Sequence, residues 1–495
     1  MLSSARKVSG YFLILALICA VFADLAIISA DPWSELRRIA SGFLQPVFFS
    51  WSELLQSVAY TLAFAVIGVG VSAFLGLLLA RMFHWRAVRV LCAAVRSVHE
   101  LFWALFFLQI FGVQTLTGLL AIIIPFTGIF TKVYAEILEE SDHKPLHTLP
   151  EQSWQSASAY LYARLAVAWP QLAMYTRYRL ECGIRSSAIL GFVGLPTLGF
   201  HLESFYKQGD YAEAAGVLYL FFLIIATMKY WSHRWLLGAM FIAAVMFLPF
   251  DFSVHCDSLQ RFLFQDIWPA PLRNADSLLE LSVWGETLAW AQWLVQTQAL
   301  EGIINTLLLT MIALVGTGLV TLLLYPLVSP LFFKKPVRWP SHGFLVVLRS
   351  LPELMLAFII VIMIGPSMLP AIIALSLHNG AIIAHLLGQS TRTLRLREDA
   401  PRGMNLYLYE VTPRLYRPFL AFLFYRWEVI LRESAILGIL GIHTLGFYVD
   451  SAFEELRFDR ALFLIFICAL LNILVDSCSR FIRKRLSLTG LPEVN

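Results

Sequence analysis

The stretch ECGIRSSAILGFVGLPTLGF at residues 181–200 recurs as EVILRESAILGILGIHTLGF at residues 428–447. The copies are 247 residues apart, half the length of the chain, and share the pattern R-x-S-A-I-L-G-x-x-G-x-x-T-L-G-F. A second matching pair, RSVHE at 96–100 and RSLPE at 349–353, lies at an offset of 253 residues. Apolar composition alone does not reproduce this placement of Arg, Ser, Gly and Thr. The sequence therefore predicts a tandem duplication, with one unit at 1–232 and a second at 233–495.

The composition indicates a chain that is embedded in lipid. Of its 495 residues, 59% are hydrophobic and only 14% are charged, whereas soluble domains carry roughly 25% charged residues. This deficit excludes a soluble enzyme, a disordered scaffold and a nucleic-acid-binding module, and it predicts an all-α polytopic membrane protein. The six cysteines are scattered and form no Cys/His cluster, which argues against a metal site or a disulfide framework. No cofactor is expected.

Apolar stretches long enough to cross a bilayer as helices occur about twelve times. In the first half they lie at 11–30, 54–80, 98–113, 115–137, 168–193 and 213–231, and in the second half at 235–250, 301–328, 343–364, 367–390, 415–440 and 460–479. We interpret the first as a membrane helix and not as a cleaved signal, because its counterpart in the second half cannot be one. With six spans each, the halves are expected to share one orientation and to be related by a two-fold axis along the membrane normal.

Lys and Arg in short loops mark the cytoplasmic side of a membrane. Segments 81–97 and 329–349 each carry four of them without an acid, and 391–417 holds six arginines, whereas 251–300 and 443–460 lean acidic. Both termini are therefore expected in the cytoplasm. Segment 138–170 has more acids than bases, but the repeat requires it to be cytoplasmic as well.

Charged residues occur inside the fifth predicted span of each half. The pairs Glu181/Arg185 and Glu428/Arg432 are four residues apart, so each lies on one helical face and can form an ion pair. A bare charge at the bilayer centre costs roughly 2.5–3.5 kcal/mol, so these side chains should face protein or a wet cavity. Two interpretations stay open: ion pairs that lock helices together, or arginines that line an anion route, since the guanidinium fork binds two oxygens of a phosphorus oxyanion. The candidate pathway residues are Arg96, Glu100, Arg179, Glu181, Arg185, Arg349, Glu353, Arg426, Glu428 and Arg432.

Three glycines recur in register in the two halves. They are Gly191, Gly194, Gly199, Gly438, Gly441 and Gly446. Such glycines allow helix backbones to pack closely, or they mark a break in a helix that lines a gate. The chain has no phosphate-binding loop of the G-x-x-x-x-G-K-[ST] type, so any nucleotide hydrolysis must come from a partner.

The predicted cytoplasmic segments 138–170 and 391–417 are long enough for short helices outside the membrane. Glu151 precedes Glu181 by 30 residues, and Glu398 precedes Glu428 by the same distance. Loops that are merely solvated would not need this equal spacing between the glutamates of the two halves. We therefore predict that both segments form a docking surface for a partner.

These motifs together resemble the permease subunits of phosphonate-type ABC importers, within the broad family of binding-protein-dependent permeases. The likeness rests on R-x-x-P/H-E-L at 96–101 and 349–354, on YAEILEE at 134–140, on Y-R-x-E at 178–181 with Y-R-W-E at 425–428, and on the glycine-containing repeat. It covers both halves almost entirely. The resemblance implies a type I importer fold made of two permease units fused in one chain.

The resemblance also implies partners. In the family, a cytoplasmic loop beginning E-A-A, with a later Gly and Pro, inserts into an ATPase subunit. Matching positions here are Glu151, Ala157, Pro170, Glu398, Ala400 and Gly403, although both loops keep the motif only in part. Two cytoplasmic ABC ATPase subunits and a periplasmic or extracellular substrate-binding protein are implied, with the chain itself in the bacterial inner membrane.

The function expected on this basis is the permease component of an ATP-driven importer for a phosphonate or related phosphorus oxyanion. The run that phosphonate permeases carry after the repeat is replaced here by LPTLG at 195–199 and IHTLG at 442–446, so amino acids or compatible solutes stay open as substrates. The alternative from another class is an ion-coupled transporter or channel without ATP, with Glu181 and Glu428 as ion sites. No catalytic constellation is present, so the chain is not expected to be an enzyme.

Overall fold

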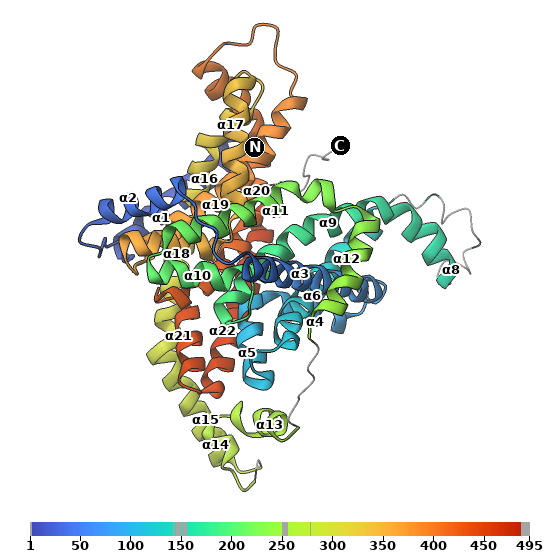
Figure 1. Cartoon of the computed structure of the whole chain (residues 1–495), viewed down its shortest axis with the longest axis vertical. Helices are drawn as coiled ribbons and strands as arrows, with labels where there is room; N and C mark the ends of the chain where they lie inside the picture. The colour runs from blue at the N-terminus through green and yellow to red at the C-terminus, as the bar shows by residue number, and fades with distance from the viewer. Residues whose placement is uncertain are drawn as a thin grey trace. The chain divides into compact units, whose positions relative to one another are not determined.

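We analysed a computed structural model of the chain, which describes residues 2–141, 144, 150, 156–249, 256–277 and 279–486. Figure 1 shows that the described chain is built of helices, and no strand occurs among these residues. The predicted all-α class is therefore confirmed. The chain divides into two compact units, which we call the first core (residues 41–256) and the second core (residues 1–40 with 257–495).

Each core repeats the same order of helices. The first core contains α3 (Trp51–Ala80), α4 (Arg86–Ser97), α5 (Glu100–Phe111), α6 (Thr115–Glu140), α8 (Ala157–Ala159), η2 (Tyr160–Leu165), α9 (Ala166–Ile189), η3 (Leu190–Val193), α10 (Leu198–Gln208), α11 (Tyr211–Trp231) and α12 (Arg234–Phe247). The corresponding helices of the second core are α16 (Leu300–Val328), α17 (Lys335–Ser350), α18 (Glu353–Ile364), α19 (Met368–Ser390), η6 (Thr391–Thr393), η7 (Leu406–Val411), α20 (Thr412–Ile436), η8 (Leu437–Leu440), α21 (Leu445–Glu454) and α22 (Phe458–Arg485). The second core also contains α1 (Leu2–Phe22), and α2 (Pro32–Leu44) crosses the boundary between the units.

Up to ten spans among the described helices have the length and composition needed to cross a membrane. Six long apolar helices qualify by themselves, and four bent helix pairs qualify when each is counted as one span. The shorter apolar helix α12 and the 21-residue helix α1 complete the predicted number. The polytopic all-α architecture predicted from the sequence is thus confirmed.

The chain bends sharply at both copies of the motif RSVHE/RSLPE, at the start of the predicted span 98–113 and inside the predicted span 343–364. Helices α4 and α5 meet at 89°, and α17 and α18 meet at 94°, in both cases just before the shared glutamate. The sequence explains the bend, because α4 and α17 are amphipathic and basic whereas α5 and α18 are apolar throughout. Helices of the first kind suit the surface of a membrane and helices of the second kind suit its interior.

Helix α1, which begins the sequence half 1–232, packs with helices of the half 233–495. Helix α12, which begins the second half, packs with helices of the first. Helix α1 contacts α16 and α20, where the Phe12 ring lies 5.1 Å from that of Phe424 and Tyr416 donates a 2.6 Å hydrogen bond to the Ser9 hydroxyl. Helix α12 contacts α3, where the ring centroids of Phe247 and Tyr60 lie 5.1 Å apart. The compact units are therefore divided after residues 40 and 256, whereas the repeat boundary at 232 stays a prediction about sequence units.

Two details differ from the predicted spans. Helix α1 ends at Phe22 instead of continuing to residue 30, because residues 24–29 form backbone hydrogen bonds with the turn between α18 and α19 (Ile28 N to Ile364 O, 2.9 Å; Met368 N to Asp24 O, 3.0 Å). The segment 251–300, expected as a loop, contains α13 (Cys256–Arg261), η4 (Phe262–Asp266), α14 (Ala270–Arg273), α15 (Leu281–Leu294) and η5 (Val295–Ala299). Helix α15 continues through η5 into α16 as one helix of 48 residues, with α14 at one end and α17 beyond the other (Figure 1).

Candidate functional site

The second core contains a buried cluster of polar side chains between α18, α19 and α20. The Glu353 carboxylate lies 2.7 Å from His378 Nε2, and Asn379 donates a 3.1 Å hydrogen bond to Glu433. Arg426 reaches the other end of the same amide, with its Nη1 atom 3.4 Å from Asn379 Oδ1. His378 and Asn379 are completely buried, and Glu353 and Glu433 are each 8% exposed. Two of the predicted pathway residues, Glu353 and Arg426, therefore belong to one cluster. They are linked by the adjacent side chains of His378 and Asn379 on α19.

The corresponding cluster of the first core is simpler. Glu100 accepts a 2.7 Å hydrogen bond from the Ser186 hydroxyl, and His99 Nε2 lies 3.5 Å from its carboxylate. Arg179 donates a 2.8 Å hydrogen bond to the Tyr175 hydroxyl, and its guanidinium lies within 6 Å of the Phe126 ring centroid. In the first core, aromatic rings thus stabilise the charge of Arg179 by cation–π contact. In the second core, the Asn379 amide takes this role for Arg426.

Comparing the two clusters by the repeat offsets shows how they have diverged. At the offset of 247 residues, Glu433 corresponds to Ser186, and at 253 residues Asn379 corresponds to Phe126. The second core therefore holds two carboxylates where the first core holds one. The halves are alike in fold but differ in the charge that they bury.

The remaining predicted charges lie near these clusters or at the bends. Arg96 and Arg349 occupy the last turns of α4 and α17. Arg185 Nη2 lies 3.4 Å from Cys182 Sγ, and Glu181 forms no ion pair with any residue that the structure describes. The Glu181/Arg185 ion pair that the spacing allows is therefore not formed, and the arginine lies at Cys182 instead. Glu428 and Arg432 lie half-buried on α20.

The six glycines lie at two broken helices, three in each core, and serve two different purposes there. Gly194 and Gly441 have φ values of +87° and +78° and end the 3₁₀ turns that follow α9 and α20. A Cβ atom at Gly199 would lie 1.7 Å from the Ala188 carbonyl oxygen, and one at Gly446 would lie 1.5 Å from that of Ala435. Gly191 and Gly438 allow the same close approach, because a Cβ atom there would lie about 2 Å from the backbone of the next helix. Both interpretations of the glycines, close packing and a helix break, are thus present in the geometry.

Each broken helix is anchored to the long helix of its own core. The Leu198 amide donates a 3.0 Å hydrogen bond to the buried Thr61 hydroxyl, and the Leu445 amide donates one of the same length to Thr306. Tyr160 and Tyr407 repeat this relation at the other end of α9 and α20, by donating to the carbonyls of Leu77 and Leu322 at 3.5 and 3.0 Å.

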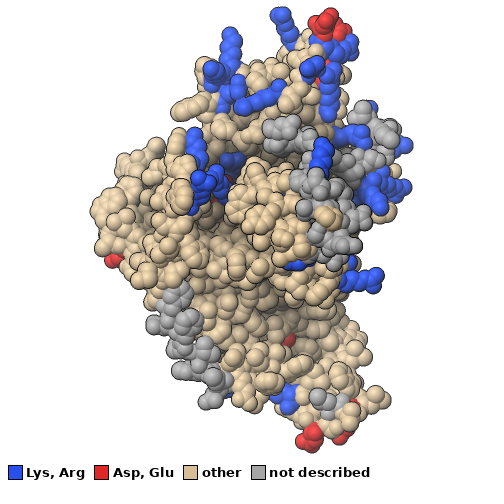
Figure 2. All heavy atoms as spheres, turned by 90° about the vertical axis from the view of Figure 1, so that its right-hand side faces the viewer, with Lys and Arg blue, Asp and Glu red and all other residues tan. Residues whose placement is uncertain are grey.

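The predicted coupling residues are only partly within the described chain. Glu151 lies outside the described residues, Ala157 begins α8, and Pro170 lies inside α9. In the second core, Glu398 is exposed, Ala400 is half-buried, and Gly403 has a φ of +63° in the loop at 394–405. Lys and Arg side chains gather at the end of the second core that carries this loop and α17 (Figures 1 and 2).

The loop at 394–405 is held by charged contacts. Arg397 donates hydrogen bonds to both carboxylate oxygens of Asp399, at 2.9 and 2.5 Å, and this contact holds the pKa of Asp399 below its ordinary value. Arg414 pairs with the buried Glu410 and donates a 2.8 Å hydrogen bond to the Arg395 carbonyl. The loop therefore folds back onto the start of α20.

Sequence reasoning missed several residues of these sites. His378 and Asn379 are adjacent polar residues in an otherwise apolar span, which is the signal that could have indicated them. Glu410 and Arg414 are four residues apart on a helix, the spacing of an ion pair. Among the described residues no group of three His, Cys, Asp or Glu side chains could hold a metal ion.

The chain is similar to permease proteins of known transport systems. It is 24% identical to the phosphate-import permease protein PhnE of Mycolicibacterium smegmatis over 433 residues, which cover 81% of this chain and 77% of that protein. It is 26% identical to the phosphite transport system permease protein PtxC of Stutzerimonas stutzeri, over 40% of this chain and 75% of that protein, and 28% identical to the putative phosphite permease HtxE of the same organism, over 29% of this chain and 55% of that protein. No family model and no solved structure matches the chain.

The coverage of these relatives agrees with the internal repeat. The match to the PhnE protein of Mycolicibacterium smegmatis covers 81% of this chain, which is more than one sequence half contains. The similarity therefore spans both units. PtxC is matched over three quarters of its own length within 40% of this chain, as expected of a protein about the size of one unit. The chain is thus similar, across both units, to permease proteins of phosphate, phosphite and phosphonate transport systems.

Proposed function

We propose that this chain forms the complete membrane-spanning part of an ATP-driven importer for a phosphorus oxyanion, such as a phosphonate, phosphite or phosphate. The observation that supports this most is the similarity to a phosphate-import permease across both units. A chain with two fused units needs no second permease subunit, since each unit supplies one half of a pseudo-symmetric pore.

The proposed location is the bacterial inner membrane, with both termini in the cytoplasm. The basic segments at 81–97, 329–349 and 391–417 support this orientation. It puts the helices α13–α15 on the outer side, where a soluble substrate-binding protein would deliver the solute.

Two ATPase subunits are proposed to dock on the cytoplasmic segments that precede α9 and α20. In support, each segment enters its core through a π-helical turn, η2 or η7, whose tyrosine contacts the long helix α3 or α16. π-Helical turns are rare and occur often at functional sites. ATP binding and release would favour different positions of these segments and so shift the pore between outward- and inward-facing states.

Helices α9 and α20 begin directly after these π-helical turns. The proposed pathway includes the arginines that these two helices carry. Reversing Arg185 and Arg432 to Glu is expected to abolish uptake of the anion, because a carboxylate would repel it. Normal uptake by such a variant, once shown to be folded by thermal unfolding, would remove both arginines from the pathway.

Reconstituted vesicles provide the direct test. The chain would be co-purified with its cognate ATPase and binding protein. Uptake of radiolabelled methylphosphonate, phosphite and phosphate would be compared with that of an amino acid and glycine betaine. ATP-dependent uptake of a phosphorus oxyanion is expected. Uptake that continues without ATP and stops when the proton gradient is collapsed would instead favour an ion-coupled transporter with Glu181 and Glu428 as ion sites.

A further inference from the structure

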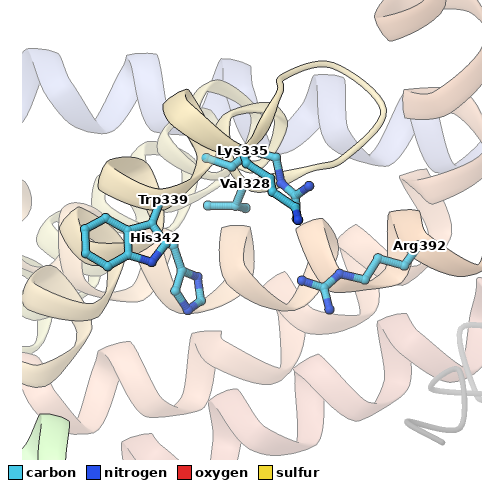
Figure 3. A pocket seen from close by; sticks show the side chains of 6 residues that line it. Val328, Lys335, Trp339, His342 and Arg392 are labelled. Atoms are coloured by element: carbon cyan, nitrogen blue, oxygen red, sulfur yellow. The ribbon is translucent and has the colours of Figure 1, made fainter.

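The second core has a basic cavity that the transport model does not use. Its volume is about 300 Å³, and it lies beside the first turns of α17, close to the end of α16 and to η6. Figure 3 shows the side chains that line it, which are Val328, Lys335, Arg338, Trp339, His342 and Arg392. Three of these side chains are cations and none is a carboxylate.

The cations of this cavity are not neutralised by the protein. Lys335, Arg338 and Arg392 form no ion pair within the described part of the chain, and the buried Nε atom of Arg338 has no hydrogen-bond partner. Other arginines of the same core are paired, as Arg414 is with Glu410 and Arg480 with Asp476. Three cations around one cavity without a carboxylate partner among the described residues leave room for an acidic acceptor from outside the chain.

The repeat shows that the three cations lining this cavity are specific to the second core. At the offset of 253 residues, Arg338 corresponds to Trp85, Lys335 to Met82 and Arg392 to Glu139. The first core thus has no cation at these positions and has a carboxylate at one of them.

The chemistry of the cavity suits a phosphate group. The guanidinium groups of Arg338 and Arg392 and the ammonium group of Lys335 can donate hydrogen bonds to phosphate oxygens. Helix α17 begins at Lys335 without a side-chain cap, so the positive end of its dipole also lies at the cavity. Trp339 is 85% exposed and Phe344 is 52% exposed on the same helix. Exposed aromatic side chains beside a basic pocket are typical of a membrane–water interface, where lipid phosphates lie.

We infer that the cavity formed by Lys335, Arg338 and Arg392 binds a phosphate group, carried either by an anionic phospholipid or by a free phosphorus oxyanion. Binding there goes beyond the proposed transport pathway and does not depend on which solute is transported. A bound group would fix α17 against α19 and so stabilise the second core.

The test uses the full chain purified in detergent and two probes. Native mass spectrometry would count retained phosphatidylglycerol against phosphatidylcholine, and thermal unfolding would be followed with inorganic phosphate against chloride at equal ionic strength. The variant is Arg338→Gln/Arg392→Gln. The control is Arg86→Gln/Arg89→Gln, which removes two exposed charges from the corresponding helix α4 but leaves the cavity intact.

We expect the wild-type chain and the control to bind at least one probe, and the cavity variant to bind it about tenfold more weakly or worse, as the loss of charge-assisted hydrogen bonds predicts. Preference for phosphatidylglycerol alone would assign the site to lipid, and stabilisation by inorganic phosphate alone would assign it to a free oxyanion. The inference would be overturned if the wild-type chain preferred neither probe, or if the cavity variant bound like the control. Arg392→Gln alone, at an exposed position, covers the case in which the double variant does not fold.

Discussion

At the scale of single residues, the repeated glycines have the least freedom to change. Gly446 lies against the backbone of Ala435, and a Cβ atom there would approach its carbonyl oxygen to 1.5 Å. We expect Gly446→Ala to lower the stability by roughly 3 kcal/mol or to prevent folding, because backbone cannot give way as a flexible side chain can. Thermal unfolding in detergent measures this.

The matched control for that substitution is Gly238→Ala on α12, where no atom lies within 4 Å of the added Cβ. It should leave the unfolding temperature unchanged or raise it slightly, since alanine favours a helix. Equal effects of the two substitutions would show that the close approach at Gly446 is not required.

The buried cluster of the second core makes a second prediction at this scale. His378→Leu removes the side chain that lies 2.7 Å from Glu353 and leaves that carboxylate buried with less compensation. We expect a loss of about 3–5 kcal/mol, as for other buried pairs that lose one partner. Adding Glu353→Gln to the same chain should recover most of the stability, because the charge is then gone. Loss by His378→Leu without recovery in the double variant would mean that His378 acts by packing alone.

At the scale of elements, the loop at 394–405 depends on the start of α20. Arg414→Gln breaks the pair with Glu410 and the hydrogen bond to the Arg395 carbonyl. We expect the loop to open, with cleavage after Glu398 by a glutamate-specific protease becoming several-fold faster while the unfolding temperature changes little. Arg480→Gln is the control: it breaks a pair of the same kind, between an exposed arginine and the buried Asp476 on α22, and should not alter cleavage. Unchanged cleavage in Arg414→Gln would show that the pair does not hold the loop.

At the scale of the whole molecule, the exchanged leading helices make the halves interdependent. A fragment of residues 257–495 lacks α1 and the segment 24–29, which pack within the second core. We expect co-expression with residues 1–40 to raise its unfolding temperature by about 5 °C or more, and Phe12→Ala in that peptide to reduce the gain. The fragment 41–256, which contains its own α12, should gain nothing. A fragment 257–495 that unfolds at the same temperature with and without the peptide would contradict the interdependence.

The sequence alone determined the duplication, the all-α membrane class and the approximate positions of the spans. These follow from residue order, because apolar length, the placement of charge and the repeat at 181–200 and 428–447 are properties of the chain itself. The same order singled out the glycines, which lie at the helix breaks, and two charged residues, Glu353 and Arg426, that belong to the buried cluster of the second core.

Only the tertiary structure decided which side chains meet. The sequence could not reveal that Glu353 pairs with His378, that α1 packs with the second core, or that Lys335, Arg338 and Arg392 surround one cavity. In each case the partners come from helices that are distant in the sequence or separated by a bend. Spacing along one helix predicts contacts on that helix, but contacts between helices depend on where each helix bends and which neighbour it finds.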